Sequence, residues 1–180
     1  MVEAAARIRL VALDVDGVLT DGGIILGATA AGERVELKRF EITDGLGINL
    51  LQQAGIEVAI VTGRSSAAVQ LRAEELSIRE CHQGASPAKL PVLEGVAERL
   101  GIGLEEVAFM GDDLADLPVL RRVGFAAAPR DAVPEVRAEA DWVARRRGGE
   151  GAVRELAELL LRARGAWAGA VEAYVGRDVE

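Results

Sequence analysis

Residues 10–23, LVALDVDGVLTDGG, are the stretch from which the rest of the chain can be interpreted. It begins as a short apolar run, which is typical of a strand buried on both faces of a parallel sheet. Asp14 and Asp16 follow where this run ends. Because one residue separates them, an extended backbone directs both carboxylates to the same side. Neighbouring carboxylates repel each other, and a divalent cation or a shared proton commonly relieves that repulsion.

A second acidic cluster argues against the simplest alternative, a solvated turn. Asp and Gly are common turn residues, so the first stretch alone is compatible with a turn. However, the apolar run 107–110 is followed by GDDLAD at 111–116. The carboxyl ends of parallel strands meet at one edge of an α/β sheet, where ligands bind. We therefore expect five carboxylates to converge at this edge, together with Thr62–Arg64 and Lys89: Asp14, Asp16, Asp112, Asp113 and Asp116.

Strand-like and helix-like patterns alternate along the chain. Strands are predicted at 8–15, 57–61, near Cys81, at 107–110, 125–127 and 142–143. Helices are predicted at 44–54, 66–76, 89–100, 117–123, shortly after Pro134, and at 152–164. This alternation predicts an α/β fold with a Rossmann-like, doubly wound parallel sheet, in a single domain that spans residues 1–180.

Residues 24–40 interrupt the alternation and predict a small β-hairpin. Within them, ERVELKRF at 33–40 alternates apolar residues with Glu36 and Lys38, the pattern of a half-exposed strand. An isolated hairpin is only marginally stable, so we expect it to pack against another subunit as an oligomerisation flap. The C-terminal tail, 165–180, carries apolar residues at near-helical spacing, and the sequence does not place it.

The composition limits the classes of function. The net charge of −8 argues against general binding to nucleic acid or to acidic membranes. A single cysteine excludes a disulfide framework and a cysteine-based zinc site. There is neither a run of about 20 apolar residues nor a signal-peptide pattern at the N-terminus, so a cytoplasmic location is expected. No complete glycine-rich nucleotide-binding motif occurs.

The predicted cluster of residues is suited to phosphoryl transfer. Two carboxylates about 4 Å apart repel by about 1 kcal/mol in water and by about 4 kcal/mol at an effective dielectric of 20. A hard dication relieves this repulsion, and ligands that are all oxygen atoms favour Mg²⁺. One aspartate would attack phosphorus, Lys89 and the metal would neutralise the phosphoryl oxygens, and a second aspartate would transfer the proton.

Four motifs resemble, in order and spacing, those of the haloacid dehalogenase superfamily of phosphatases. They are DVDGVLTDG at 14–22, VTGR at 61–64, Lys89, and GDDLADLP at 111–118. Further features resemble the 3-deoxy-D-manno-octulosonate 8-phosphate phosphatase branch: no large cap insertion, the hairpin after the first motif, FEITDGLGI at 40–48 and GGEGAVREL at 148–156. The resemblance covers residues 8–164.

This resemblance implies a role for each motif residue. Asp14 is expected to be the nucleophile that forms an aspartyl-phosphate, and Asp16 the general acid and base. Mg²⁺ is expected to bind Asp14, the main-chain carbonyl of Asp16, and Asp112. Thr62 and Lys89 are expected to bind the phosphoryl group.

Other residues of the motifs are assigned to the substrate or to support of the metal site. Gly63 and Arg64 are expected to bind substrate, with Arg64 gripping its carboxylate; the alternative is a surface arginine that caps the preceding loop. Asp116 is expected to orient metal ligands, and Asp113 either to support the metal site or to cap a helix. Arg145–Arg147 either reach a neighbour's substrate or form a solvated charged face.

The resemblance also implies a homotetramer with active sites near subunit interfaces, and a role in lipopolysaccharide biosynthesis. Two departures leave the sugar open, because Thr43 replaces the family's usual basic residue and the loop 84–88 is less polar than expected. One alternative is a phosphatase for a sialic-acid-type nonulosonate 9-phosphate or another small sugar phosphate. Another is a non-catalytic assembly module related to a domain of cytidylyltransferases. Such modules lose motif residues, and all the motif residues are present here.

Overall fold

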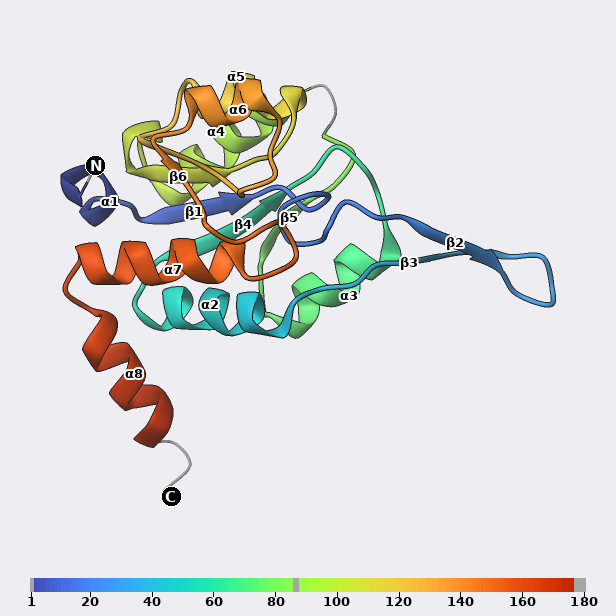
Figure 1. Ribbon diagram of the computed structural model, residues 1–180, viewed down its shortest axis with the longest axis horizontal. Coiled ribbons are helices and arrows are strands. Elements are labelled where there is room, and N and C mark those ends of the chain that lie inside the picture. The colour runs from blue at the N-terminus through green and yellow to red at the C-terminus, as the bar shows by residue number, and fades with distance from the viewer. Residues whose placement is uncertain (1, 86–87, 177–180) are drawn as a thin grey trace.

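A six-stranded parallel sheet forms the centre of the molecule in the computed structural model, which describes residues 2–85 and 88–176 (Figure 1). The strand order is β5-β4-β1-β6-β7-β8. This arrangement confirms the predicted Rossmann-like α/β fold. The strands are β1 (Leu10–Leu13), β4 (Glu57–Val61), β5 (Glu80–His82), β6 (Val107–Met110), β7 (Phe125–Ala128) and β8 (Trp142–Val143).

Helices cover both faces of the sheet. In Figure 1, α4, α5 and α6 lie above the sheet, and α2 and α7 lie side by side below it. Two short 3-10 helices, η1 (Leu104–Glu106) and η2 (Leu114–Asp116), flank β6. The α-helices are α1 (Val2–Ala6), α2 (Ile42–Gln53), α3 (Ala67–Glu75), α4 (Lys89–Leu100), α5 (Leu117–Leu120), α6 (Pro134–Glu139), α7 (Ala152–Ala163) and α8 (Trp167–Val175).

The position of β1 at the centre of the sheet explains why its sequence is continuously apolar. Val11 and Leu13 belong to the core formed with α2 and α7, whereas Leu10 and Ala12 belong to the core formed with α4, α5 and α6. All four residues are inaccessible to solvent. Side chains alternate between the faces of a strand, so a strand covered on both faces needs apolar residues at every position.

Several predicted boundaries were wrong at the ends of elements. The helix predicted at 44–54 begins at Ile42, whose 79% exposure hides it from any apolar periodicity, and Glu41 serves as its N-cap. The strand predicted at 8–15 is confined to Leu10–Leu13, and the helix predicted at 117–123 ends at Leu120. Helix α1 was not predicted, because five residues offer no complete apolar period.

The predicted hairpin is confirmed, and the structure shows which of its faces meets the protein. Strands β2 (Ile25–Ala28) and β3 (Arg34–Leu37) pair antiparallel and project from the body of the molecule (Figure 1). Leu37 is 56% exposed, whereas the side chain of Lys38 is fully buried. The charged face therefore turns toward the protein, and apolar side chains of the hairpin face solvent.

The predicted tail forms a separate helix, α8, after Gly165. The ring of Trp167 lies under the guanidinium groups of Arg154 and Arg162, at 5.4 and 4.8 Å from its centroid. Residues 177–180 of the tail, and Ser86 and Pro87 of the loop 84–88, lie outside the described residues. Among the helices described, none has the length and apolar character needed to cross a membrane.

Candidate active site

The carboxyl ends of three adjacent strands form the floor of the site. Leu13, the last residue of β1, pairs with Ile60 of β4 and with Met110 of β6. Asp14, Thr62 and Asp112 therefore follow neighbouring strands at the same edge of the sheet. The backbone N–H of Asp14 continues the ladder by donating to the carbonyl of Met110 at 3.1 Å.

Three carboxylates converge at this edge. One oxygen from each of Asp14, Asp112 and Asp116 lies within 4.8 Å of the other two. Gly17 permits this approach, because a Cβ atom at this position would lie 2.0 Å from Asp112 Oδ2. Its φ of +90° also belongs to the region that glycine adopts readily. The glycine of the DVDG motif thus makes room for the second acidic motif.

Lys89 links the cluster to helix α4. As the first residue of that helix, it directs its buried Nζ to Asp116 Oδ1 at 2.7 Å and to Asp14 Oδ1 at 3.0 Å. The other oxygen of Asp116 accepts hydrogen bonds from the backbone N–H groups of Asp112 and Asp113, at 2.9 and 3.3 Å. Asp116 therefore fixes both the lysine and the turn that carries Asp112.

Burial and mutual repulsion shift the pKa values of these groups. Desolvation raises the pKa of Asp14 to about 6, with a further contribution from Asp116. Desolvation, followed by the charges of Asp14 and Asp116, raises the pKa of Asp112 to about 8. Burial alone would lower the pKa of Lys89, but the adjacent Asp14 and Asp116 outweigh it and raise that pKa. One lysine does not neutralise three carboxylates.

The cluster fits a hard divalent cation. Asp112 Oδ1 is buried and accepts no hydrogen bond from any part of the chain that the structure describes. All the available donors are oxygen atoms, and the carboxylates carry more negative charge than Lys89 offsets. A cation at this position would satisfy Asp112 and relieve the repulsion, and Mg²⁺ is the ion whose preferences match such donors.

Asp16 and Asp113 are not part of this cluster, so the expected convergence of five carboxylates was wrong. The Asp16 side chain contacts two cations instead. Its Oδ1 forms an ion pair with Lys38 Nζ, and its Oδ2 lies 3.4 Å from Arg64 Nε. Arg64 also contacts Glu36 at 3.0 Å. Asp113 is exposed and caps η2, since its Oδ1 accepts from the N–H of Leu114 at 2.7 Å. The main chain of Asp16 follows Asp14 by two residues and therefore remains close to the cluster.

Thr62 and Gly63 occupy the strand end next to Asp14. Thr62 is 2% exposed, its N–H donates to the His82 carbonyl at 3.0 Å, and its carbonyl accepts from the N–H of Ala85 at 2.9 Å. Gly63 is half-buried and leads to the exposed Arg64. These hydrogen bonds hold the Thr62 backbone in place between β4 and the loop that leads to Lys89.

The glycine-rich segment before α7 packs on the loop after Asp16. A Cβ atom on Gly148 would lie 1.8 Å from the Gly17 carbonyl, and the N–H of Gly149 donates to the Val18 carbonyl at 2.9 Å. Asp44 holds the other end of the segment, because its Oδ1 accepts from the N–H of Arg154 at 2.7 Å. The segment thereby ties α2 and α7 to the loop that carries Gly17.

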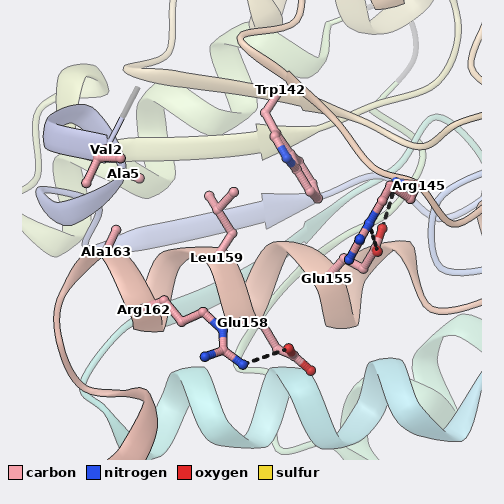
Figure 2. Close-up of a pocket in the computed structure, with 9 residues that line it drawn as sticks. All are labelled: Val2, Ala5, Trp142, Arg145, Glu155, Glu158, Leu159, Arg162 and Ala163. Atoms are coloured by element: carbon pink, nitrogen blue, oxygen red, sulfur yellow. Dashed lines mark hydrogen bonds and ion pairs between the residues drawn. The ribbon is translucent and has the colours of Figure 1, made fainter.

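A separate cavity of about 500 Å³ lies between α1, β8 and α7, away from these carboxylates (Figure 2). It has apolar walls, including Trp142 and Leu159. Its two arginines are already paired, Arg145 with Glu155 at 3.0 Å and Arg162 with Glu158 at 3.5 Å. Arg147 similarly lies 3.8 Å from Asp131. Arg145 and Arg147 thus have partners within the chain.

Comparison with known proteins agrees with this geometry. Residues 47–124 match a family model described as haloacid dehalogenase-like hydrolase. Over 165 residues, the chain is 47% identical to 3-deoxy-D-manno-octulosonate 8-phosphate phosphatase KdsC of Escherichia coli strain K12, covering 92% of this chain and 85% of that protein. The chain belongs to the 3-deoxy-D-manno-octulosonate 8-phosphate phosphatase family.

Solved structures of this phosphatase family share the fold. The phosphatase from Moraxella catarrhalis, in complex with a magnesium ion, a phosphate ion and a KDO molecule, superposes with a TM-score of 0.89 at 42% identity, covering 96% of this chain and 97% of that one. The cobalt-bound phosphatase from Haemophilus influenzae has a TM-score of 0.83 at 36% identity, covering 92% and 94%.

The sequence did not identify every group at this edge of the sheet. From the hairpin, Lys38 contacts Asp16 and Glu36 contacts Arg64. The sequence did not predict these contacts, because alternation of charged and apolar residues is also typical of a strand with one face in solvent. Asp44 was treated as the start of a helix rather than as a buried carboxylate. One signal could have indicated the contact between Lys38 and Asp16. The hairpin is inserted directly after the acidic motif, so the lysine at its end returns to that motif.

Proposed function

We propose that this protein is a Mg²⁺-dependent phosphomonoesterase that hydrolyses 3-deoxy-D-manno-octulosonate 8-phosphate through an aspartyl-phosphate on Asp14. The observation that carries the proposal is the Asp14–Lys89–Asp116–Asp112 cluster at the carboxyl edge of the sheet, in a chain that is 47% identical to the Escherichia coli phosphatase over most of its length. The complex of the Moraxella catarrhalis phosphatase with magnesium, phosphate and KDO supports the same substrate.

Asp14 is the proposed nucleophile. Its carboxylate oxygen forms a bond to phosphorus while the bond from phosphorus to the sugar oxygen breaks, and the Asp16 carboxyl donates its proton to that leaving oxygen. Water then attacks the aspartyl-phosphate, and the Asp16 carboxylate accepts the proton of this water. Inorganic phosphate leaves, and both aspartates return to their starting states.

The remaining residues hold the phosphoryl group and its charge. Lys89 Nζ, already 3.0 Å from Asp14 Oδ1, is placed to neutralise a phosphoryl oxygen, and Thr62 and the Gly63 backbone are proposed to donate hydrogen bonds to it. Asp14, the Asp16 carbonyl and Asp112 would hold Mg²⁺, which supplies electrostatic stabilisation of the phosphoryl oxygens. Asp116 keeps Lys89 and Asp112 oriented.

Arg64 is the proposed contact for the substrate carboxylate. Its guanidinium is 44% exposed and is shared between Glu36 and Asp16. A planar guanidinium binds a carboxylate through two parallel hydrogen bonds. Thr43 carries no charge that could contact an acidic sugar, so we assign the substrate carboxylate to Arg64.

We further propose that the protein acts in the cytoplasm as a homotetramer assembled through its hairpins. The projecting hairpin exposes Ile25, Leu26 and Leu37 at 56–59%. Apolar side chains gathered on an exposed surface are typical of a protein–protein interface. A neighbouring subunit would cover these side chains. The same neighbour would close an active site that has no large cap domain.

The substrate is tested by measuring phosphate release from a panel of sugar phosphates with and without Mg²⁺. The panel contains 3-deoxy-D-manno-octulosonate 8-phosphate, nonulosonate 9-phosphates and simple hexose phosphates. We expect Mg²⁺-dependent release with the highest kcat/KM for the octulosonate. A preference for a nonulosonate would replace the substrate and keep the chemistry. No release from any ester would contradict the enzymatic function and favour an assembly module.

A further inference from the structure

We propose that Lys38, from the base of the hairpin, is a positioning residue that holds the general acid and base Asp16 in place. This inference rests on the proposed function, since it assumes that Asp16 exchanges a proton with the leaving group and with water. Neither the motifs of the sequence nor the comparisons assign a role to this lysine.

The first argument is the contact itself. Lys38 Nζ forms an ion pair and hydrogen bond with Asp16 Oδ1, across 22 positions of sequence. The Lys38 side chain has no solvent exposure, although the residue follows the exposed strand β3. A buried ammonium loses its hydration, so it remains charged there only when acceptors surround it. Asp16 and Glu36 are those acceptors.

The second argument is that four charged groups contact one another, and a fifth, the exposed Arg34, lies 3.8 Å from Glu36 at their rim. Lys38 Nζ lies 3.5 Å from Glu36 Oε1, Arg64 contacts the other Glu36 oxygen at 3.0 Å, and Arg64 also lies 3.4 Å from Asp16 Oδ2. Among these four groups the two cations balance the two carboxylates, and solvent screens the 71% exposed Arg34. Glu36 therefore shares both cations with Asp16, so the set fixes the direction of Asp16 without adding a net charge to it.

The third argument concerns the substrate. If Arg64 turns to bind a substrate carboxylate, it releases Asp16 Oδ2, and the contact with the buried Lys38 is the one that remains. Arg64 is 44% exposed and free to make this movement, whereas Lys38 is enclosed. Lys38 then still holds Asp16 Oδ1, and Asp16 Oδ2 is left to exchange a proton with the leaving group.

This arrangement links assembly to chemistry. The hairpin that is proposed to join subunits also carries the contact to Asp16 at its base. A displaced hairpin would leave Asp14, Lys89 and Asp112 in position and would remove the support of the proton donor. Loss of general acid catalysis typically costs about 10²-fold to 10⁴-fold in rate.

The test compares esters whose leaving groups differ in their need for a proton. Expulsion of a sugar alkoxide requires an acid, whereas 4-nitrophenolate leaves without one. We compare kcat/KM, which reports the steps up to transfer of the phosphoryl group to Asp14, for the octulosonate phosphate and for 4-nitrophenyl phosphate. The variants are Lys38→Met, which keeps the length and removes the charge, Lys38→Arg, which keeps the charge, and Asp16→Asn as the reference.

We expect Lys38→Met to lose on the order of 10²-fold in kcat/KM for the sugar ester and less than about 3-fold for the aryl ester, as Asp16→Asn does. Because Asp16 also activates water, both variants should show a burst of one 4-nitrophenolate per site followed by slow turnover. Lys38→Arg should recover part of the lost activity toward the sugar ester.

The matched control is Arg34→Met. It removes one positive charge from the same hairpin, at a side chain that is 71% exposed and that contacts Glu36 at 3.8 Å. We expect its activity toward both esters to stay near that of the wild type. Lys38→Gln is measured alongside, so that poor folding of Lys38→Met, checked by circular dichroism and by size, does not decide the result.

Equal losses for both esters, without a burst, would overturn the role of Lys38 and leave the proposed function intact. Unchanged activity toward the sugar ester in folded Lys38→Met or Lys38→Gln would do the same. A wild-type protein that hydrolyses neither ester, or that does so independently of Asp14, would overturn the proposed function and this role together.

Discussion

At the scale of single residues, the site depends on charges that are buried before any ligand binds. Desolvation and the charge of Asp116 raise the pKa of Asp14 to about 6, and desolvation with the charges of Asp14 and Asp116 raises the pKa of Asp112 to about 8. Each carboxyl is therefore easier to protonate in the folded protein than in the unfolded chain. Without metal, the free energy of unfolding should fall as the pH rises from about 4 to about 8. Over this range the unfolded chain ionises freely, whereas ionisation in the folded protein creates buried carboxylates that repel one another.

A divalent cation should reverse this trend. Mg²⁺ binds the deprotonated carboxylates, so its stabilising effect on the folded state should be larger at pH 8.5 than at pH 6. We expect Asp112→Asn to abolish most of the rise in Tm that saturating Mg²⁺ produces. Thermal unfolding monitored by fluorescence, with Mg²⁺ titrated at each pH, measures both effects.

Asp113→Asn provides the matched control for this measurement. It removes the same charge one position away, from an exposed side chain that caps η2. Its Mg²⁺-dependent shift in Tm should stay close to that of the wild type. Equal losses in the two variants would indicate a diffuse electrostatic effect and would contradict a metal site built on Asp112.

At the scale of elements, Asp44 joins helix α2 to helix α7. The side chain is 1% exposed, Oδ1 accepts from the N–H of Arg154 in the first turn of α7, and Oδ2 is buried without a hydrogen bond among the described residues. Desolvation raises the pKa of Asp44 to about 6 despite the hydrogen bond from Arg154. The carboxylate therefore stabilises the fold as a hydrogen-bond acceptor, but its buried charge lowers the free energy of unfolding.

Asp44→Asn should change how stability depends on pH. The amide oxygen keeps an acceptor for Arg154, and the buried charge is removed. The wild type loses stability from about pH 4 to pH 6 as Asp44 ionises, so Asp44→Asn should gain about 2 kcal/mol relative to it between pH 4.5 and pH 7.5. Urea unfolding at both pH values measures this difference, and a difference that does not change with pH would contradict the assignment.

The elements also show what could be predicted from sequence. Strand β1 was predictable because a strand buried on both faces requires a continuous apolar run. Asp14 and Asp112 were predicted to lie together because neighbouring parallel strands end at one edge of the sheet. The start of α2 was not predictable, since Ile42 is exposed and Glu41 is an unusual N-cap. Lys38 was not predictable either, because alternation defines two faces of β3 without saying which one meets the protein.

At the scale of the whole molecule, the exposed hairpin is the feature that needs a partner. Ile25 pairs with Leu37 across the hairpin, and both side chains are more than half exposed. We expect Ile25→Asp to dissociate the proposed homotetramer into smaller species and to lower turnover of the sugar phosphate, because a neighbour would no longer cover the site. Size-exclusion chromatography with light scattering, followed by phosphate release at the same concentration, measures both.

Leu71→Asp is the control for the loss of an apolar side chain. Leu71 lies on α3 and is 66% exposed, so the substitution adds the same charge to a surface outside the hairpin. Its assembly and turnover should match those of the wild type. A monomeric Ile25→Asp protein with full turnover would show that the hairpin is not needed to complete the site.

The central claim is that Asp14 carries the phosphoryl group during turnover. The most direct measurement is acid quenching during turnover of the octulosonate phosphate with Mg²⁺, followed by peptide mass spectrometry. We predict that the peptide containing Asp14 gains the mass of one phosphoryl group, that Asp16→Asn accumulates this species when it is given 4-nitrophenyl phosphate, and that Asp14→Asn lacks it and releases no phosphate. Phosphate release by Asp14→Asn, or a phosphoryl group on another residue, would contradict the account.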